Sequence, residues 1–421
     1  MEVNNIQSLA GSMSKNGFPN PSIVLTKQQA RKFLLNHHHL LKPRALPGRQ
    51  GILEVIQLLG CIQFDPVNVV GRNPDLVLQS RVRDYQPSML YDLLYKDRLL
   101  WDGWDKLASI YPAGDWHYFG RHRKHMLEGY GKPEDPPMQV AEMVREAIRK
   151  NGASDSLSIR HDTRMDWWWG KPVSLVRACM EILYFTGELG IHHRTGTRRF
   201  FDFTENLLAP DLYHREDPNI TQDDYHDWHV LRRIGSLGMA RVGGSDAWLG
   251  ITGLKTPERV AALHRLIEDG RVLLIGIQEH PGKEFFIRTG DWEIQAAGLD
   301  GQLEDCYASF LAPLDNMLWD RGLVQLLFDF SYTWEVYKPP SRRTYGHYTL
   351  PVLYGDAFVA RMDARMDKKS RTLVLQNWWW EPDITLDSEM RGALLNGIHD
   401  FSRYLEADYI RVEDSAIQDL L

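Results

Sequence analysis

Two stretches of the chain, residues 136–205 and 222–290, repeat one order of predicted elements. In the first stretch, two amphipathic helices precede the strand-like segments GELGIHHR and TRRFFDF, which are joined by a Thr195–Gly196 turn. In the second stretch, a helix that starts at Thr256–Pro257 precedes RVLLIGIQ and EFFIR, which an HPGK turn connects. Helices followed by a basic hairpin are the order of the winged helix, which can place its second helix in a DNA major groove. The repeat therefore predicts tandem winged-helix units.

The N-terminal part contains a possible third copy of this unit. Thr26 and Gln29 have the spacing of a capping box, so a helix is expected to begin at Thr26. A second helix fits Arg49–Leu59, and the short β-branched run CIQFDPVNVV after it is typical of a strand. Residues 1–22 are polar and are predicted to form a mobile tail.

The pattern changes from about residue 305 onward. Short β-rich runs follow one another, separated by Pro, Gly, Asp and Lys turns: LVQLLFDFSYTWEVY, YTLPVLYG, DAFVARMDAR and SRTLVLQNWWW. They predict a small antiparallel sheet or barrel, closed by a helix at Asp387–Glu406. The expected fold class is therefore α+β, with tandem winged-helix units followed by this small antiparallel β-barrel or sheet domain.

Composition permits a nucleic-acid partner without establishing one. The net charge of −7 argues mildly against DNA, but basic residues cluster at Arg121–His125, His192–Arg199 and Pro339–Arg343. The chain has no apolar run long enough to span a bilayer and no evident secretory signal, which predicts a cytoplasmic location without membrane contact. The 3 cysteines are widely separated, so we expect neither a disulfide framework nor a metal or other cofactor.

The segment around Gln63 and Asp65 combines two polar side chains with apolar neighbours. In an extended run, residues 63 and 65 project to one face and Phe64 to the other, so an amide and a carboxylate would lie side by side. From this spacing alone, an exposed and solvated strand edge is the more common explanation.

Two longer motifs add a resemblance to a known family. IQFDPVNVVGR at 62–72 with LQSR at 78–81 is the first, and FLAPLDNMLWDR at 310–321 with the run from Leu327 to Asp363 is the second. The chain resembles the winged-helix DNA glycosylases that repair bulky alkylation and interstrand crosslinks, over most of its length after the first twenty or so residues. With Gln63-Phe64-Asp65, it is similar to the Gln-x-Asp branch of that family, known for broad substrate tolerance and crosslink unhooking.

The resemblance implies catalytic roles for Gln63 and Asp65. Many relatives carry a histidine soon after the arginine that matches Arg72, whereas this chain has Asn73-Pro74-Asp75, which puts any histidine-assisted step in doubt. An N7-alkylated purine carries a positive charge and leaves as a neutral base, so a carboxylate and an oriented water suffice for hydrolysis. We therefore expect a monofunctional enzyme that cleaves no DNA strand.

An open basic channel for damaged DNA is the further expectation, because a crosslinked base cannot swing freely into a closed pocket. The residues expected to contact DNA are Arg72, Arg81, Arg194, Arg198, Arg199, Arg342 and Arg343. The alternative is that these arginines only solvate hairpins. The motif residues Asp315, Asn316 and Arg321 either close the cleft near the lesion or lock a domain interface. The triplets Trp167–Trp169 and Trp378–Trp380 could stack bases, although such triplets more often fill cores.

These expectations divide the chain into five parts. They are a tail (1–22), a first winged-helix unit with the Gln-Phe-Asp strand (23–130), a second (131–215), a third (216–300) and a β-barrel-like domain with a closing helix (301–421). The predicted protein is a nucleoid-associated monomer of base excision repair that acts on double-stranded DNA containing N7-alkylated purines. A non-catalytic winged-helix transcription regulator remains the alternative.

Overall fold

The computed structural model describes residues 16–168, 170–301, 303, 306–418 and 420. Residues 1–15 of the predicted tail and Trp169 lie outside the described residues. The part of the tail that is described does not behave as predicted. Phe18 is fully buried, and its ring stacks on His264 with 4.2 Å between the ring centroids. The prediction of a mobile tail is therefore wrong at Phe18.

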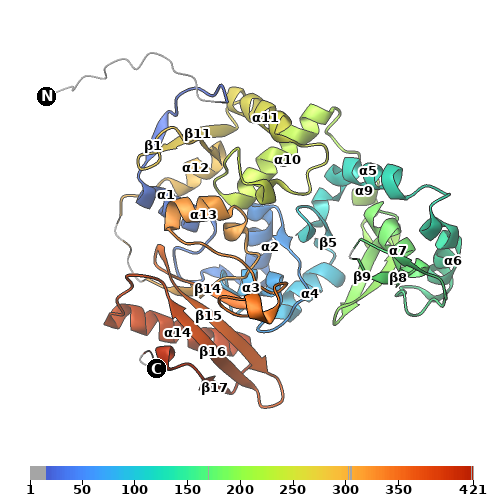
Figure 1. Ribbon diagram of the computed structural model, residues 1–421. Coiled ribbons are helices and arrows are strands. Elements are labelled where there is room, and N and C mark those ends of the chain that lie inside the picture. Colours follow the sequence, from blue (N-terminus) through green and yellow to red (C-terminus); the bar gives the residue numbers. More distant parts are fainter. Residues whose placement is uncertain (1–15, 169, 302, 304–305, 419, 421) are drawn as a thin grey trace.

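Three segments of the chain share one topology (Figure 1). In each segment a first helix leads into a short strand or bridge, one or more helical segments follow, and a hairpin ends the unit. The first segment consists of α2 (Gly48–Leu59), β3 (Ile62–Gln63), α3 (Asn73–Gln79), α4 (Pro87–Tyr95), β5 (Leu100–Trp104) and β6 (Ala108–Pro112). Its sheet has the order β3-β6-β5, so the strand after the first helix pairs with the second strand of the hairpin.

The other two segments keep that pairing with a single bridge in place of the first strand. The second consists of α6 (Ala141–Asn151), a bridge from Ser154 to Phe201, α7 (Leu175–Phe185), β9 (Leu189–Thr195) and β10 (Arg198–Phe203). The third consists of α10 (Gln222–Leu237), a bridge from Ala240 to Phe286, α11 (Thr256–Glu268), β11 (Val272–Ile277) and β12 (Phe285–Arg288). Both predicted hairpins are therefore present at the predicted turns.

The N-terminal elements extend the third segment, not the first. The capping box at Thr26 and Gln29 is present and starts α1 (Lys27–His37). β1 (Ile23–Leu25) pairs in parallel with β11, and α1 packs against α12 (Thr289–Gln295) and α13 (Arg321–Phe328). The structure thus differs from the predicted unit boundary at residue 23, because the chain returns to its beginning some 250 residues later.

The C-terminal part is a five-stranded sheet covered by one long helix. Its strands are β13 (Ala308–Phe310), β14 (Thr349–Tyr354), β15 (Ala357–Asp367), β16 (Thr372–Trp380) and β17 (Tyr409–Val412), and the helix is α14 (Ser388–Tyr404). Neighbouring strands are antiparallel except β16 and β17, which are parallel, and the described pairings form an open order rather than a closed ring. The predicted run LVQLLFDFSYTWEVY is not a strand, because its first part forms α13.

The remaining elements connect these parts. They are β2 (Leu46–Pro47), β4 (Val82–Arg83), α5 (Gly120–Tyr130), β7 (Arg164–Asp166), β8 (Pro172–Ser174), α8 (Thr204–Leu207) and α9 (Pro210–Tyr213). The 3₁₀ helices are η1 (Ala113–Phe119), η2 (Pro136–Val140), η3 (Ser245–Trp248), η4 (Asn316–Leu318), η5 (Pro340–Arg342) and η6 (Ser415–Ile417). Among the described residues, no helix has the length and apolar character that a membrane span requires.

The second segment stands apart from the rest as a lobe (right in Figure 1). The first segment lies at the centre, where one hydrophobic core joins α2, α3 and α4 to the C-terminal sheet and α14. β3 is thus held at the middle of the molecule, between the lobe, the third segment and the C-terminal sheet.

Candidate active site and candidate nucleic-acid interface

The strand β3 places Gln63 and Asp65. α2 ends at Gly60, whose positive φ of 73° turns the chain from the helix into the strand, a conformation that glycine adopts without strain. Ile62 and Gln63 then pair with Ile110 and Ser109 of β6, and the Phe64 N–H donates to the carbonyl of Ala108 at 2.8 Å. The backbone is therefore fixed by hydrogen bonds up to the residue before Asp65.

Gln63 is almost fully buried, with 5% of its surface exposed. Its Oε1 lies 3.4 Å from Nζ of Lys106, and its backbone carbonyl accepts a hydrogen bond from Nδ2 of Asn73 at 2.8 Å. Oδ1 of Asn73 in turn accepts from the N–H of Leu314 at 2.9 Å. Asn73 therefore serves as a buried cross-link behind the strand.

Asp65 is half-buried and has no basic side chain among its described partners. Burial raises the pKa of its carboxyl above the ordinary value, and hydrogen bonds from the Val67 N–H and the Tyr337 hydroxyl partly oppose this rise. The Val67 N–H donates to Oδ1 at 2.9 Å. Phe64, between the two candidate residues, lies beneath Arg194, whose guanidinium is 4.0 Å from the ring centroid. Among the described residues, no basic side chain therefore forms an ion pair with the Asp65 carboxylate.

The motif at 310–321 fastens other segments to the strand. Asp315 is fully buried and pairs with both terminal nitrogens of Arg81 at 2.8 Å. Nδ2 of Asn316 donates to the carbonyl of Cys61 at 2.9 Å and to that of Ser236 at 3.3 Å. Of the two predicted roles for Asp315 and Asn316, the structure supports the interface lock, whereas Arg321 is exposed at the start of α13.

The prediction that Arg81 contacts DNA is wrong. Its side chain has no exposed surface, and Nε also donates to the carbonyl of His38 at 2.8 Å. A guanidinium whose donors are occupied by a buried carboxylate and backbone carbonyls is not accessible to a phosphate.

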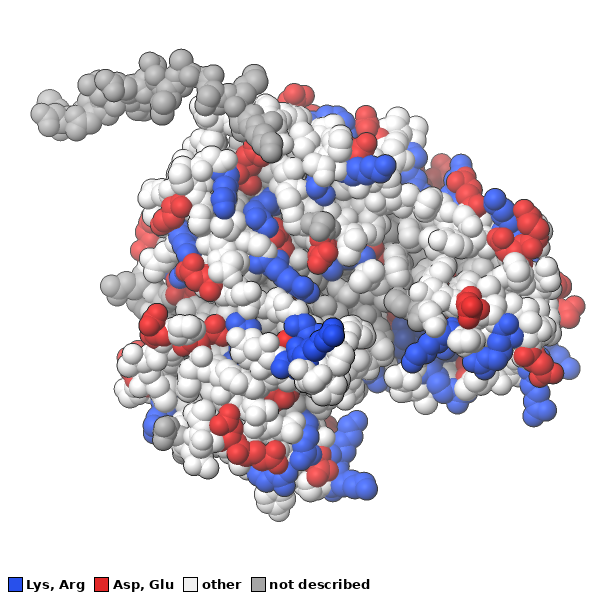
Figure 2. All heavy atoms as spheres, viewed as in Figure 1, with Lys and Arg blue, Asp and Glu red and all other residues white. Residues whose placement is uncertain are grey.

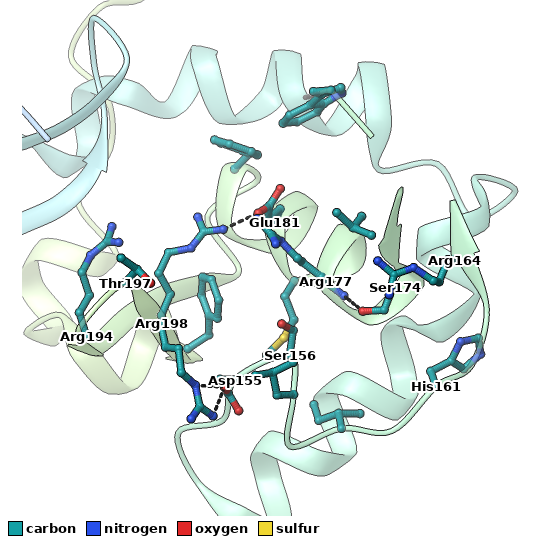
Figure 3. Close-up of a pocket in the computed structure, with 18 of the residues that line it drawn as sticks. Asp155, Ser156, His161, Arg164, Ser174, Arg177, Glu181, Arg194, Thr197 and Arg198 are labelled. Carbon is teal, nitrogen blue, oxygen red and sulfur yellow. Dashed lines mark hydrogen bonds and ion pairs between the residues drawn. The ribbon is translucent and has the colours of Figure 1, made fainter. Parts of the chain in front are cut away.

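A cavity of about 810 Å³ opens between the first segment and the lobe. Phe64, Pro66 and Ala108 line one wall, and residues from α7 and the β9–β10 hairpin line the other. Figure 3 shows Arg194, Thr197 and Arg198 on one side of the cavity and His161 and Arg164 on the other. The cavity therefore combines apolar surface from the candidate catalytic strand with a basic rim from the lobe.

The predicted hairpin arginines are unequally available at this rim. Arg194 forms a bidentate pair with buried Asp102 of β5, at 2.6 and 3.0 Å, and so joins the lobe to the first segment. Arg198 pairs with Asp155 and keeps 51% of its side chain exposed, while Arg199 pairs with Glu181 and is less exposed. Only Arg198 and Arg199 therefore retain surface with which to meet a phosphate.

The remaining predicted arginines lie outside this hairpin. Arg342 is exposed and forms no ion pair with a described residue, whereas Nε of Arg343 donates to the carbonyl of Lys338 at 2.9 Å. Arg72 is half-buried at the N-terminus of α3.

Comparison with known proteins adds the family. A model of the family described as DNA glycosylase AlkZ-like matches residues 56–404, which is most of the chain. The chain belongs to the AlkZ-like DNA glycosylase family. Among solved structures, it is similar to the DNA glycosylase AlkZ of Streptomyces sahachiroi, with 14% sequence identity, a TM-score of 0.60, and coverage of 93% of this chain and 99% of that one. At 14% identity, the similarity to the Streptomyces structure shows a common fold. The family match identifies the chain as a DNA glycosylase and not as a transcription regulator.

Three residues of this AlkZ-like glycosylase were not predicted from the sequence. Buried Glu335 accepts hydrogen bonds from Lys338 Nζ and from the N–H groups of Thr344 and Tyr345, each at 2.8 Å. Although burial opposes it, these hydrogen bonds lower the pKa of Glu335 to about 2. These hydrogen bonds fold a loop that holds Tyr337 beside Asp65, and 79% of the surface of Tyr337 is exposed. The third residue, Lys106, contacts Gln63 from the β5–β6 turn.

The tryptophan triplets mostly fill cores in this glycosylase. Trp167 is buried, and its Nε1 donates to Glu181 at 2.6 Å, and Trp378 is buried as well. Trp168 is 40% exposed and lines the cavity. Of the two described tryptophans of the first triplet, Trp168 is therefore the one that presents an accessible ring to the cavity.

Proposed function

We propose that this enzyme is a monofunctional DNA glycosylase for N7-alkylated purines, including those tethered in interstrand crosslinks, with Gln63 and Asp65 as its catalytic residues. The observation that carries the proposal is the state of Asp65. Its carboxylate lies at a half-buried position two residues after Gln63, without a neutralising cation among its described partners. An unpaired carboxylate in a partly desolvated position is suited to stabilise a developing positive charge.

The chemistry follows from the charge of the substrate. As the bond between C1′ and N9 breaks, its electron pair neutralises the purine cation, and the base leaves without a general acid. The deoxyribose becomes oxocarbenium-like, and ionised Asp65 stabilises it. Gln63 orients a water, the water oxygen bonds to C1′, and Asp65 accepts the proton released. Because burial raises the pKa of Asp65, the carboxylate is a stronger base for that proton than an exposed aspartate.

We further propose that the three segments of common topology are winged-helix units that hold DNA over β3. Figure 2 shows the molecule hollowed between the lobe and the main body, with Lys and Arg side chains at the rim. A hollow of this kind leaves room for a base that stays attached to the opposite strand. The arginines that support backbone contact are Arg72, Arg198, Arg199, Arg342 and Arg343.

The test is release of free base from two duplexes, one with N7-methylguanine and one with an N7-linked interstrand crosslink. We expect release from both, with no strand cleavage until the abasic product is treated with alkali. Activity on the monoadduct alone would remove the crosslink part of the proposal. Absence of release from both, with binding retained, would remove the assigned substrate class.

A further inference from the structure

Lys106 is buried although it lies in the turn of a hairpin. Only 6% of its surface is exposed, and Nζ is 3.4 Å from Oε1 of Gln63 and 4.9 Å from the ring centroid of Trp319. No carboxylate forms an ion pair with it among the described residues. A lysine in this setting is rare, because burial of an unpaired ammonium is costly.

The groups that face Lys106 come from four other parts of the fold. They are Arg233 on α10, Arg321 at the start of α13, Asp246 on η3 and Cys61 just before β3. Burial lowers the pKa of Lys106 to about 8, and the two arginines add to this decrease while Asp246 and Cys61 oppose it. Lys106 is therefore still mainly protonated at neutral pH but loses its proton within a range that an assay can reach.

The protonated form constrains Gln63. An ammonium group has three donors and no acceptor, so Gln63 must direct its amide oxygen, not its amide nitrogen, toward Lys106. The Nε2 group then faces away from Lys106 and forms no hydrogen bond with a described residue. A neutral amine could accept as well as donate, so loss of the proton would allow either amide orientation.

We propose that Lys106 is a positioning residue that holds the Gln63 amide with Nε2 free to donate to the attacking water. A water that accepts this hydrogen bond and donates to Asp65 keeps its remaining lone pair for C1′. The inference rests on the catalytic roles proposed for Gln63 and Asp65. It assigns a function to a side chain that otherwise destabilises the centre of the molecule.

The test compares the wild-type enzyme with K106M, which keeps the unbranched side chain up to the position of Cε and removes the ammonium donors. Single-turnover release of N7-methylguanine is measured for both between pH 6 and 10, and the ratio of the two rates is taken at each pH, so that titration of the DNA cancels. We expect the wild-type enzyme to be about tenfold faster below pH 8, as for loss of one hydrogen bond from a charged donor, and the ratio to approach 1 above pH 9. A ratio near 1 throughout, or a loss that does not vary with pH, would overturn the proposal.

Two controls separate the possible failures. D65N in the same assay tests the proposed function separately. If D65N is inactive while the ratio of wild-type to K106M rates does not vary with pH, the role of Lys106 is refuted and the proposed function stands. Thermal unfolding checks that K106M is folded. If K106M is unfolded, K106Q, which is neutral at every pH, replaces it, and the ratio of wild-type to K106Q rates is expected to show the same pH profile. Borohydride trapping of the wild-type enzyme on abasic DNA is expected to give no adduct through Lys106, and such an adduct would make it a nucleophile and contradict a positioning role.

Discussion

The hairpins β5–β6 and β9–β10 hold equivalent places in two segments of the same topology, yet their ends meet different surroundings. The turn of β5–β6 is buried against the third segment, where Asp105 accepts from His229 at 3.2 Å, Arg232 at 3.0 Å and Arg233 at 2.7 Å. The turn of β9–β10 is exposed at the rim of the cavity, with Arg198 beside it. In the first segment the hairpin therefore fixes the strand that carries Gln63. In the second segment the hairpin of the same topology presents charge to solvent.

Removal of a carboxylate from the buried hairpin should have the largest effect. D105N leaves Arg233, which has no exposed surface, without a counter-charge, whereas Arg232 keeps its ion pair with Asp115. We expect the free energy of unfolding in urea to fall by about 3–5 kcal/mol, as for other broken buried pairs. The matched change beside the exposed hairpin is D155N, which removes the carboxylate that Arg198 contacts. It should cost less than about 1 kcal/mol because the Arg198 side chain is half exposed to solvent. Equal losses would contradict the contrast between the hairpins.

Acid should also weaken the contact between His229 and Asp105 in the turn of the buried hairpin. Burial lowers the pKa of His229 to about 4, although its hydrogen bond to Asp105 opposes this, so between pH 6.5 and 4 the folded state binds fewer protons than the unfolded state. Protonation of His229 alone should therefore decrease the free energy of unfolding by up to about 3 kcal/mol as the pH falls through that window. Thermal midpoints across this range provide the measurement, and H229Q should show a shallower decline.

The exposed hairpin should respond at lower pH. Burial raises the pKa of Asp155, but the hydrogen bond and charge of Arg198, together with the hydrogen bonds from Ser158, outweigh burial, and the net shift is downward. Its contribution to stability is therefore present above the unfolded pKa and is lost only as the pH falls through the lower folded value. Destabilisation of D155N relative to wild type that vanishes already near pH 6 would be inconsistent with this pairing.

Charge removal at the exposed hairpin should affect DNA binding more than folding. R198A/R199A is expected to weaken binding to undamaged duplex about tenfold at low salt and to reduce the slope of log K against log salt by about 1.8, for two lost phosphate contacts. The control is K124A/K150A, which removes two exposed lysines of α5 and α6 that do not line the cavity. An unchanged slope in R198A/R199A, or the same loss in the control, would remove the assignment.

The sequence was most informative where local chemistry decides the structure. The capping box at Thr26, the apolar face of α2 and the Thr195–Gly196 turn are short-range signals, and each is present as predicted. The short apolar run at 323–328 was misassigned as a strand because a buried helix and a buried strand are equally apolar. There Asp320 caps the helix by accepting from the N–H of Leu323.

Long-range partners could not be predicted from one sequence. Arg81 looks like a phosphate contact until Asp315, 234 residues away, is seen to occupy it. Lys106 gave no signal, since a lone lysine in a turn is ordinarily solvated, and its burial depends on Trp319 and the third segment. Gln63 and Asp65 were proposed through family resemblance, and their spacing alone did not separate them from a solvated strand edge.

The most direct test of the account is single-turnover release of N7-methylguanine by D65N, with binding to the same duplex measured in parallel. Asn keeps the size of the side chain and removes the negative charge that, in the proposed function, stabilises the sugar. We predict that base release falls by at least about a hundredfold while the dissociation constant stays within about threefold of the wild-type value, as expected when a charge acts only in the transition state. Release by D65N at the wild-type rate, with binding intact, would contradict it.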